Sequence, residues 1–413
     1  MKKLYCFFAF MLVSAFVGVP ESFGCTAAVI SGKITPDGRP LLWKHRDTGF
    51  LENCIHFFKG DRFSFVAVVN SVAENPDEVW IGTNSAGFSI MNTQSYNLVE
   101  TGPGEEKGAA NGRVMRRALE ICANVDDFRK FLDTLSKPSL IEANFGVIDA
   151  EGGAAMFEVG YYDYVMFDAN NPKDAPYGYI ARTNYSFSGK VNEGAGYVRF
   201  MTAEQILMPA SATGEITPEW IFDELSRNFS NPLIGKNLRS GEFNRPHSTG
   251  WFIDQDFIPR SSTASSAVVK GVKPGENPEL TVMWTVLGYP PTGVAVPVWV
   301  SNAGKILPEV LVKDDSLGDA PLSDKSLELS DRVFSYKQGT GSGRYFCWEK
   351  LYNNDGNGYM QLLSPVEDEV FRRACPVMEK WYQKGKVDAD EMKDLYGSID
   401  AYVTDMYKTL FGL

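Results

Sequence analysis

The chain has 413 residues, which is more than one small domain needs and enough for one large domain with an appendage or for two domains. Hydrophobic residues make up 44% of the chain and charged residues 22%, so a buried core is expected and wholesale disorder is excluded. The formal net charge of -12 argues against a nucleic acid or an anionic membrane as partner, because both require a basic face.

The N-terminus is typical of a secretory signal peptide over residues 1–24. Two lysines precede an apolar run at 4–19, which is shorter than the roughly 20 residues that a transmembrane helix needs. The small residues Ser22 and Gly24 then mark a cut in front of Cys25. The sequence therefore predicts a secreted or periplasmic protein that begins with cysteine and does not insert into a membrane after the signal is removed.

A cysteine directly after a signal peptide also occurs in lipoproteins, where it carries a lipid anchor. A flexible polar tether usually follows such a cysteine, whereas here a strand pattern starts at Cys25 itself. The lipid-anchored alternative is therefore less favoured. The signal holds one of the six cysteines, and an odd number remains, so at least one thiol is unpaired or pairs with another chain. The remaining cysteines are Cys25, Cys54, Cys122, Cys347 and Cys375.

Two strands and a turn open the processed chain. The strand patterns at 25–31 and 40–47 are separated by a Thr-Pro-Asp-Gly sequence, in which proline and glycine favour a turn. A hairpin centred on the Pro-Asp pair places Cys25 opposite Thr48. Asp47 then lies beside the new α-amino group, because cross-strand neighbours are about 5 Å apart.

The following strands and helices come in groups. Strand patterns are expected at 63–70, 79–83, 88–92, 143–149, 154–159, 177–183, 267–270, 280–287 and 293–300. Helical patterns are expected at 114–122, 125–135, 202–207 and 218–227. This grouping favours an α+β fold of two sheets with helices packed outside, and not alternating βαβ units.

The composition changes in the C-terminal part of the chain. Residues 313–343 are rich in Lys, Asp, Ser and Gly and predict a connecting segment on the surface. Residues 344–413 carry apolar stripes at helical spacing, the first interrupted at Pro376, and predict a helical extension that packs on the main domain or on itself. The predicted main domain covers 25–312, after the signal peptide at 1–24.

An N-terminal cysteine combines a nucleophile and a base in one residue. The free α-amine can take the thiol proton and later deliver it to a leaving amine. We expect Asp47 to orient the amine of Cys25, and Lys44 or Arg46 to favour the thiolate. Asn side chains or backbone N–H groups would complete the site as an oxyanion hole.

Several motifs follow one another in order along residues 25–300. They are Cys25-Thr26, the segment Lys44-His45-Arg46-Asp47, a Gly-x-Asn-x-x-Gly turn and strand at 82–90, a hairpin at 144–159, Thr183-Asn184-Tyr185-Ser186-Phe187, and the stretch 284–297. This series resembles the cysteine-type N-terminal nucleophile (Ntn) hydrolases. That family includes choloylglycine hydrolases, penicillin acylases, acid-ceramidase-like amidases and isopenicillin-N acyltransferase-like enzymes. The resemblance implies a four-layer αββα sandwich of two antiparallel sheets.

The resemblance also carries residue roles onto this chain. Cys25 matches the nucleophile and Asp47 the adjacent carboxylate. Asn184 matches an asparagine whose side chain faces the oxyanion in relatives, and Asn92 stands where the family places a second oxyanion contributor. The candidate catalytic residues are therefore Cys25, Asp47, Asn92 and Asn184.

The segment before Asp47 departs from the family pattern. The family has Arg or Gln followed by Asn, whereas this chain has Lys44 and His45, so a substrate-contacting arginine at this position has no counterpart. Arg260 is a further candidate for a substrate contact. The histidines lack the spacing of a metal site, and the Gly-x-Ser-x-Gly elbow of serine hydrolases is absent from the sequence.

The activity that the resemblance implies is hydrolysis of linear amide C–N bonds through an acyl-enzyme, with no metal or organic cofactor. The expected partner is a small-molecule amide and not a nucleic acid, and a homo-oligomer is left open. The alternatives are an acyltransferase or a dipeptidase of the same fold, or a lipid-anchored binding protein without catalysis. Acyl and amine specificity is expected in loops at 95–112 and 228–262.

Overall fold

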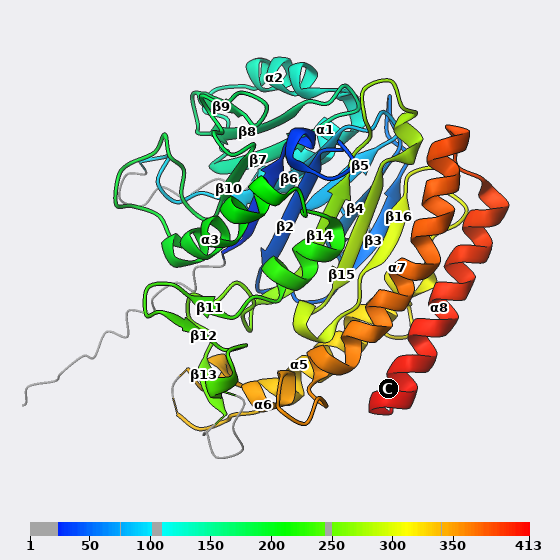
Figure 1. Ribbon diagram of the computed structural model, residues 1–413. Helices are drawn as coiled ribbons and strands as arrows, with labels where there is room; N and C mark the ends of the chain where they lie inside the picture. The colour runs from blue at the N-terminus through cyan, green and yellow to red at the C-terminus, as the bar shows by residue number, and fades with distance from the viewer. Residues whose placement is uncertain (1–23, 75, 101–109, 244–249, 340) are drawn as a thin grey trace, which may run out of the picture.

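The computed structural model describes residues 24–74, 76–100, 110–243, 250–339 and 341–413 (Figure 1). The predicted signal peptide, apart from Gly24, lies outside the described residues. Parts of the two loops expected to determine specificity, at 101–109 and 244–249, also lie outside them. No described helix has both the length and the apolar character needed to cross a membrane.

Two antiparallel sheets form the centre of the molecule (Figure 1). The six-stranded sheet contains β1 (Thr26–Ile30), β2 (Leu41–Asp47), β10 (Tyr179–Arg182), β14 (Thr263–Lys270), β15 (Val282–Leu287) and β16 (Val296–Trp299), in the order β10-β1-β2-β14-β15-β16. The seven-stranded sheet contains β3 (Asn53–Phe58), β4 (Phe65–Asn70), β5 (Ile81–Asn84), β6 (Ser89–Gln94), β7 (Ala143–Ile148), β8 (Ala154–Val159) and β9 (Tyr164–Asp168), paired in chain order.

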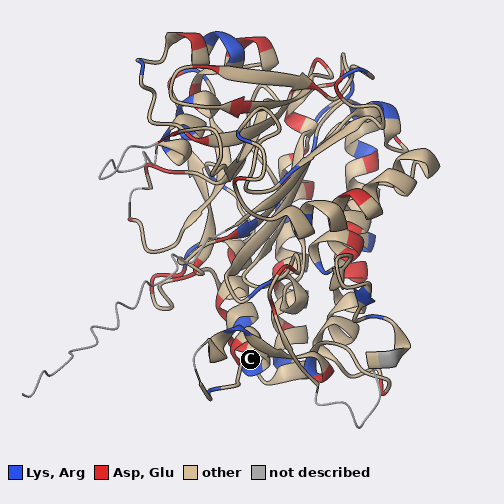
Figure 2. Cartoon of the chain, turned by 90° about the vertical axis from the view of Figure 1, so that its left-hand side faces the viewer, with Lys and Arg blue, Asp and Glu red and all other residues tan. Residues whose placement is uncertain are grey.

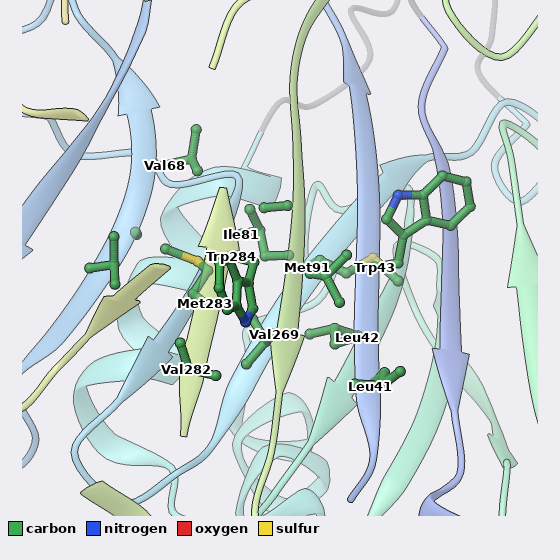
Figure 3. Close-up of a cluster of buried hydrophobic side chains, with 14 of the residues drawn as sticks. Leu41, Leu42, Trp43, Val68, Ile81, Met91, Val269, Val282, Met283 and Trp284 are labelled. Carbon is green, nitrogen blue, oxygen red and sulfur yellow. The ribbon is translucent and has the colours of Figure 1, made fainter. Parts of the chain in front are cut away.

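The two sheets pack face to face over an apolar interior. A Cβ atom added to Gly146 of β7 would lie 2.7 Å from Val29 Cγ2 of the other sheet and 2.2 Å from Met91 Cε of the same sheet, so a side chain here would force these neighbours to shift. Figure 3 shows side chains from both sheets in the same cluster, among them Leu42 from β2 and Ile81 from β5. The interior between the sheets is therefore continuous and closely packed.

Helices cover the outer face of the seven-stranded sheet. They are α1 (Asn111–Ile121) and α2 (Val125–Thr134). The side chain of Asn124 caps α2 by accepting a hydrogen bond from the Asp127 N–H at 2.9 Å. Phe128 of α2 packs edge-on against Phe157 of β8, with ring centroids 5.1 Å apart. This pair joins the helical layer to the sheet.

Helices also cover the outer face of the six-stranded sheet. They are α3 (Tyr197–Thr213), α4 (Pro218–Trp220) with a π-helical turn at Ile221–Ser226, α7 (Tyr359–Lys384) and α8 (Ala389–Phe411). Helix α5 (Pro321–Val333) lies below the strand ends in Figure 1, and its Ser323 Oγ accepts a hydrogen bond from the Asn53 N–H of β3. Trp284 of β15 stacks on Phe371 of α7 at 4.0 Å, and Trp299 of β16 packs against Trp381 at 5.1 Å. The layers are therefore helix, sheet, sheet and helix, which confirms the predicted α+β fold of αββα type.

A smaller substructure packs beside this sandwich. It contains the strand pairs β11 (Ser230–Asn231) with β12 (Lys236–Asn237) and β13 (Trp251–Ile253) with β17 (Tyr345–Cys347), and the short helix α6 (Trp348–Leu351). Phe229, Phe346 and Trp348 form the centre of its own apolar cluster. The substructure therefore joins residues before β14 to residues after α5.

The register predicted for the first hairpin is wrong by two residues. Thr26 pairs with His45, so the ladder continued backward sets Cys25 opposite Arg46 and not opposite Thr48. The reason is a 3-10 turn at Gly32–Ile34, which precedes the Pro-Asp turn and moves the centre of the connection. A shift of two residues keeps each side chain on the same face of the sheet.

Two expectations for the C-terminal part are also wrong. The segment 313–343 contains α5, whose Leu322 and Leu329 are buried, so it is more than a surface connection. Helix α7 continues through Pro376, because residues on both sides of the proline bury apolar side chains against the six-stranded sheet. The predicted extension packs as the outer helical layer, while its boundary as a separate domain remains a prediction.

A buried ion pair joins this outer layer to the chain before β14. Arg227 donates to both carboxylate oxygens of Glu367, at 2.7 and 2.6 Å, and the Ala295 N–H donates to the same carboxylate at 2.7 Å. Glu367 outweighs the effect of burial and raises the pKa of Arg227. The pair therefore fixes α7 at one position along the sheet.

Candidate active site

The last four residues of β2 are polar or charged, although the strand is buried along its whole length. They are Lys44, His45, Arg46 and Asp47. Figure 2 shows charged residues on strands in the middle of the molecule as well as on the surface helices. Because buried charges are costly without partners, each of these side chains requires polar neighbours.

Cys25 directly precedes β1 and is 9% exposed. Alternation along the strand places it on the same face as Ala27 and Val29, which is the face toward the seven-stranded sheet. Two arginines hold the backbone around it. Arg199 Nη1 donates to the Cys25 carbonyl oxygen at 2.7 Å, and Arg260 Nη2 donates to the Gly24 carbonyl oxygen at 2.7 Å.

Asp47 lies at the end of β2, in line with Gly24 on the neighbouring strand. Its Oδ2 accepts hydrogen bonds from Arg260, from Nε at 3.1 Å and from Nη2. Thr263 Oγ1 donates to Oδ1 at 2.6 Å. A bulge in β14 sets Thr263 opposite Asp47, which brings the two side chains to the same face. Arg260 thus connects the Asp47 carboxylate to the carbonyl oxygen of Gly24, the residue before Cys25.

His45 takes part in the same hydrogen-bond network. Its Nε2 lies 3.2 Å from Thr263 Oγ1. The single hydroxyl proton of Thr263 goes to Asp47, so His45 must donate its Nε2–H to Thr263. Burial lowers the pKa of His45 to about 4, so the ring is neutral at pH 7. His45 therefore supports Thr263 and contributes no charge.

Asn184 is fully buried and connects two parts of the site. Its Oδ1 accepts a hydrogen bond from Arg199 Nη2 at 2.7 Å, and its Nδ2 donates to the Gln94 carbonyl oxygen at 2.9 Å. Arg199 also donates to Thr26 Oγ1 at 2.8 Å, in addition to its bond to Cys25. The Arg199 side chain thus connects Asn184 to the backbone of Cys25.

Asn92 belongs to the seven-stranded sheet and faces Lys44 across the interior. Lys44 Nζ donates to Asn92 Oδ1 at 2.7 Å and to the Trp80 carbonyl oxygen at 2.8 Å. Because Oδ1 is directed at the lysine, the amide NH2 is the part of Asn92 that can face a substrate. Lys44 is only 1% exposed, so this contact joins the two sheets inside the core.

Two of the predicted polar residues are connected to the Gly24–Cys25 backbone through an arginine. Arg260 bridges Asp47 and the Gly24 carbonyl oxygen, and Arg199 bridges Asn184 and the Cys25 carbonyl oxygen. Asn92 is bound by Lys44, which makes no hydrogen bond to either residue among those the structure gives. Arg199 was not among the residues predicted from the sequence, although a single arginine among apolar residues at the start of a helix was a signal. The catalytic roles of the four predicted residues remain predictions.

The field around Cys25 is positive, although the whole chain carries a net charge of -12. Burial lowers the pKa of Lys44 to about 8, and that of Arg46 to about 9, while the nearby Cys25 opposes both shifts. Burial likewise lowers the pKa of Arg199 to about 10. All three groups stay charged at pH 7. Such a field favours negative charge developing on a carbonyl oxygen.

The titration of Lys44 predicts how stability depends on pH. Between about pH 8 and pH 10.5 the unfolded chain holds the Lys44 proton and the folded chain does not, so stability rises with pH in this window. We expect the unfolding free energy of the wild type to rise by about 3 kcal/mol relative to Lys44→Met, because each pKa unit corresponds to about 1.4 kcal/mol. Denaturant unfolding from pH 7 to pH 10.5 measures this difference. Lys59→Met, at an exposed lysine, is the matched control, and parallel curves for wild type and Lys44→Met would contradict the prediction.

The described residues contain neither a metal site nor a disulfide. No group of three His, Cys, Asp or Glu side chains among them lies close enough to hold a metal ion. The five described cysteines are all free thiols, and Cys25, Cys54 and Cys122 are buried. His247, the third histidine, lies outside the described residues.

Comparisons with known proteins gave matches to solved structures alone. No family model and no curated protein matches the chain. Two variants of conjugated bile acid hydrolase from Clostridium perfringens share 10% and 12% identity, each over 67% of this chain and 93% of that chain, with TM-scores of 0.40. Penicillin V acylase from Agrobacterium tumefaciens shares 12% identity over 67% of this chain and 86% of that chain, with a TM-score of 0.35. At these TM-scores the likeness adds no weight to a functional assignment.

Proposed function

We propose that this chain is an exported Ntn hydrolase that cleaves linear amide bonds with Cys25 as its N-terminal nucleophile. One observation carries the proposal. The Gly24–Cys25 peptide bond, where the signal peptide is predicted to end, is held by Arg260 on one carbonyl and by Arg199 on the next. Cleavage there would free an α-amine at the strand end that faces Asp47, next to the thiol of the same residue.

The reaction follows from this arrangement. The α-amine of Cys25 takes the thiol proton, and Sγ attacks the carbonyl carbon of the amide. The carbonyl oxygen becomes an oxyanion in the positive field, where N–H groups of Asn184 and Asn92 are the donors that the resemblance implies. The amine leaves with the transferred proton, and an acyl thioester remains on Cys25. Water then attacks the thioester, releases the acid and restores the thiol, so that amide and water give acid and amine.

The position of Cys25 supports this function over lipid anchoring. Its side chain lies on the face of β1 that is directed at the other sheet, and the residue is 9% exposed. A lipid-anchored cysteine is usually followed by a flexible tether, whereas Cys25 directly precedes β1, which is buried along its whole length. Amide hydrolysis, acyl transfer and dipeptide cleavage can all proceed with Cys25 as the nucleophile, so the position of Cys25 does not distinguish among these three reactions.

Export of the full chain, followed by intact mass and N-terminal sequencing, tests the proposal. We expect the mature protein to begin at Cys25 with a free amine. It should also convert simple N-acyl anilides to acid and aniline. A diacylglyceryl adduct on Cys25, a different first residue, or no turnover of any amide would contradict the proposal. Adding an amine acceptor separates the alternatives, because an acyltransferase would yield the exchanged amide.

A further inference from the structure

Asn144 of β7 is a fully buried polar residue that binds the chain on both sides of Asn184. Its Nδ2 donates to the Thr183 carbonyl oxygen at 3.3 Å and to the Tyr185 carbonyl oxygen at 3.2 Å. The same NH2 group donates to Thr93 Oγ1 at 2.9 Å, across the pairing of β7 with β6. One side chain of the seven-stranded sheet therefore binds the segment that follows β10 of the six-stranded sheet.

The orientation of the Asn144 amide is itself fixed. Carbonyl oxygens only accept hydrogen bonds, so the NH2 group must be the end that faces them. The remaining Oδ1 accepts a hydrogen bond from Ser186 Oγ at 2.6 Å. Ser186 is held in turn by Asn97, whose Nδ2 donates to its carbonyl oxygen at 2.9 Å and whose Oδ1 accepts from its N–H at 2.8 Å. All of these groups are buried, so each needs its partner.

The segment around Asn184 needs such support because it lies beyond the end of the sheet ladder. The pairing of β1 with β10 reaches Arg182, two residues before Asn184. The Asn184 backbone then makes an isolated bridge to Ala195, through its N–H at 3.2 Å and its carbonyl oxygen at 3.1 Å. The carbonyl oxygens before and after Asn184 are bound by Asn144. The Asn144 amide thus takes the place of a neighbouring strand along this part of the chain.

We propose that Asn144 is a positioning residue for the oxyanion site. The inference rests on the proposed function, in which an N–H of Asn184 donates to the oxyanion. The Asn184 amide is already bound at both ends, by Arg199 at Oδ1 and by the Gln94 carbonyl oxygen at Nδ2. The direction of its second N–H therefore follows the backbone, which Asn144 fixes without contacting the substrate. A displacement of about 1 Å can lower the rate by roughly 10²-fold.

The variant Asn144→Ala, assayed on an N-acyl anilide with the mature protein, tests this role. We expect kcat to fall by about 10²-fold with little change in KM, because the donor acts on the oxyanion and not on the bound amide. Asn84→Ala is the matched control. Asn84 is a buried asparagine of the same sheet whose Nδ2 donates to the carbonyl oxygens of Leu119 and Cys122, at 2.9 and 2.8 Å. This control should lose stability in the same way and keep a kcat close to that of the wild type.

A double-variant cycle separates positioning from general destabilisation. Asn184→Ala removes the donor, so Asn144→Ala should have little further effect on kcat in that background, whereas independent effects would multiply. Ser186→Ala is a milder variant, which carries the same comparison if Asn144→Ala does not fold. It removes only the hydroxyl that binds Asn144 Oδ1, and we expect kcat to fall by about tenfold or less in the wild type and to stay unchanged in Asn184→Ala.

Three results would overturn the inference and leave the hydrolase intact. They are a wild-type kcat in folded Asn144→Ala, the same loss of kcat in the presence and absence of Asn184, and an equal loss in Asn84→Ala. A wild-type protein that turns over no amide would instead overturn the proposed function, and the inference with it.

Discussion

Cys25→Ala is expected to abolish amide hydrolysis and to leave the folded state in place. The side chain is 9% exposed, and alanine occupies less volume at the same position without a new polar group. Loss of Sγ removes the atom that forms the thioester, so we expect kcat/KM to fall on the order of 10^5-fold or more, as when the nucleophile of a catalytic unit is removed. Turnover of an N-acyl anilide, with thermal unfolding as the check on folding, measures both effects.

Two comparisons make this prediction specific for Cys25. Cys122→Ala removes another buried thiol, whose pKa burial raises to about 12, and this variant should keep its turnover. A rapid acid quench of the wild type during turnover should trap the acyl group on the peptide that begins with Cys25, as seen by mass spectrometry. Retained hydrolysis by Cys25→Ala, or an acyl group on a different residue, would contradict the mechanism.

In the seven-stranded sheet, the inner strands were easier to predict from the sequence than the edge strands. The pattern at 154–159 coincides with β8, which is paired on both sides and buried throughout. The two strands of the seven-stranded sheet that the patterns missed, β3 and β9, are its edges. Residues of β9 are partly or fully exposed, so the apolar alternation that marks a strand is weak there. Edge strands are fixed by their neighbours more than by their own composition.

Helix α5 was not predicted from the sequence because the segment around it has a polar composition. The segment 313–343 reads as polar, but Pro321 stands at the first position of α5, where proline is favoured in helices. Leu322 and Leu329 then bury their side chains in the main apolar core. Two apolar residues in a polar segment gave too little periodicity to predict a helix from sequence alone.

The candidate site divides into residues that local patterns indicate and residues that only the fold brings in. Cys25 and Asp47 follow from the cut site and the hairpin, because cross-strand pairing is a local property even when its register shifts. Arg199 reaches Cys25 across 174 positions and Arg260 reaches Gly24 across 236. No turn or periodicity encodes such contacts, since they depend on how α3 and the segment before β14 pack against the start of β1.

Arg260→Met is expected to lower stability and turnover together, through its contact with Asp47. The Asp47 side chain has no exposed surface, and two of its hydrogen bonds come from Arg260. Removing the guanidinium leaves a buried carboxylate without its charge partner, which costs about 3–5 kcal/mol of unfolding free energy. It also removes the donor that binds the Gly24 carbonyl oxygen and that we expect to contact the substrate carbonyl, so kcat should fall by about 10²- to 10³-fold. Denaturant unfolding and anilide turnover measure the two losses.

A second substitution separates the loss of stability from the loss of catalytic activity. In the double variant Arg260→Met with Asp47→Asn, position 47 is neutral and can still accept the hydrogen bond from Thr263, so most of the stability should return while kcat stays low. Arg39→Met is the control for destabilisation alone, because it removes a mostly buried arginine from Asp37 and Glu276 at the other end of β2. Recovery of kcat in the double variant would show that neither the Arg260 guanidinium nor the Asp47 carboxylate is needed for turnover, and the roles proposed for both side chains would then be wrong.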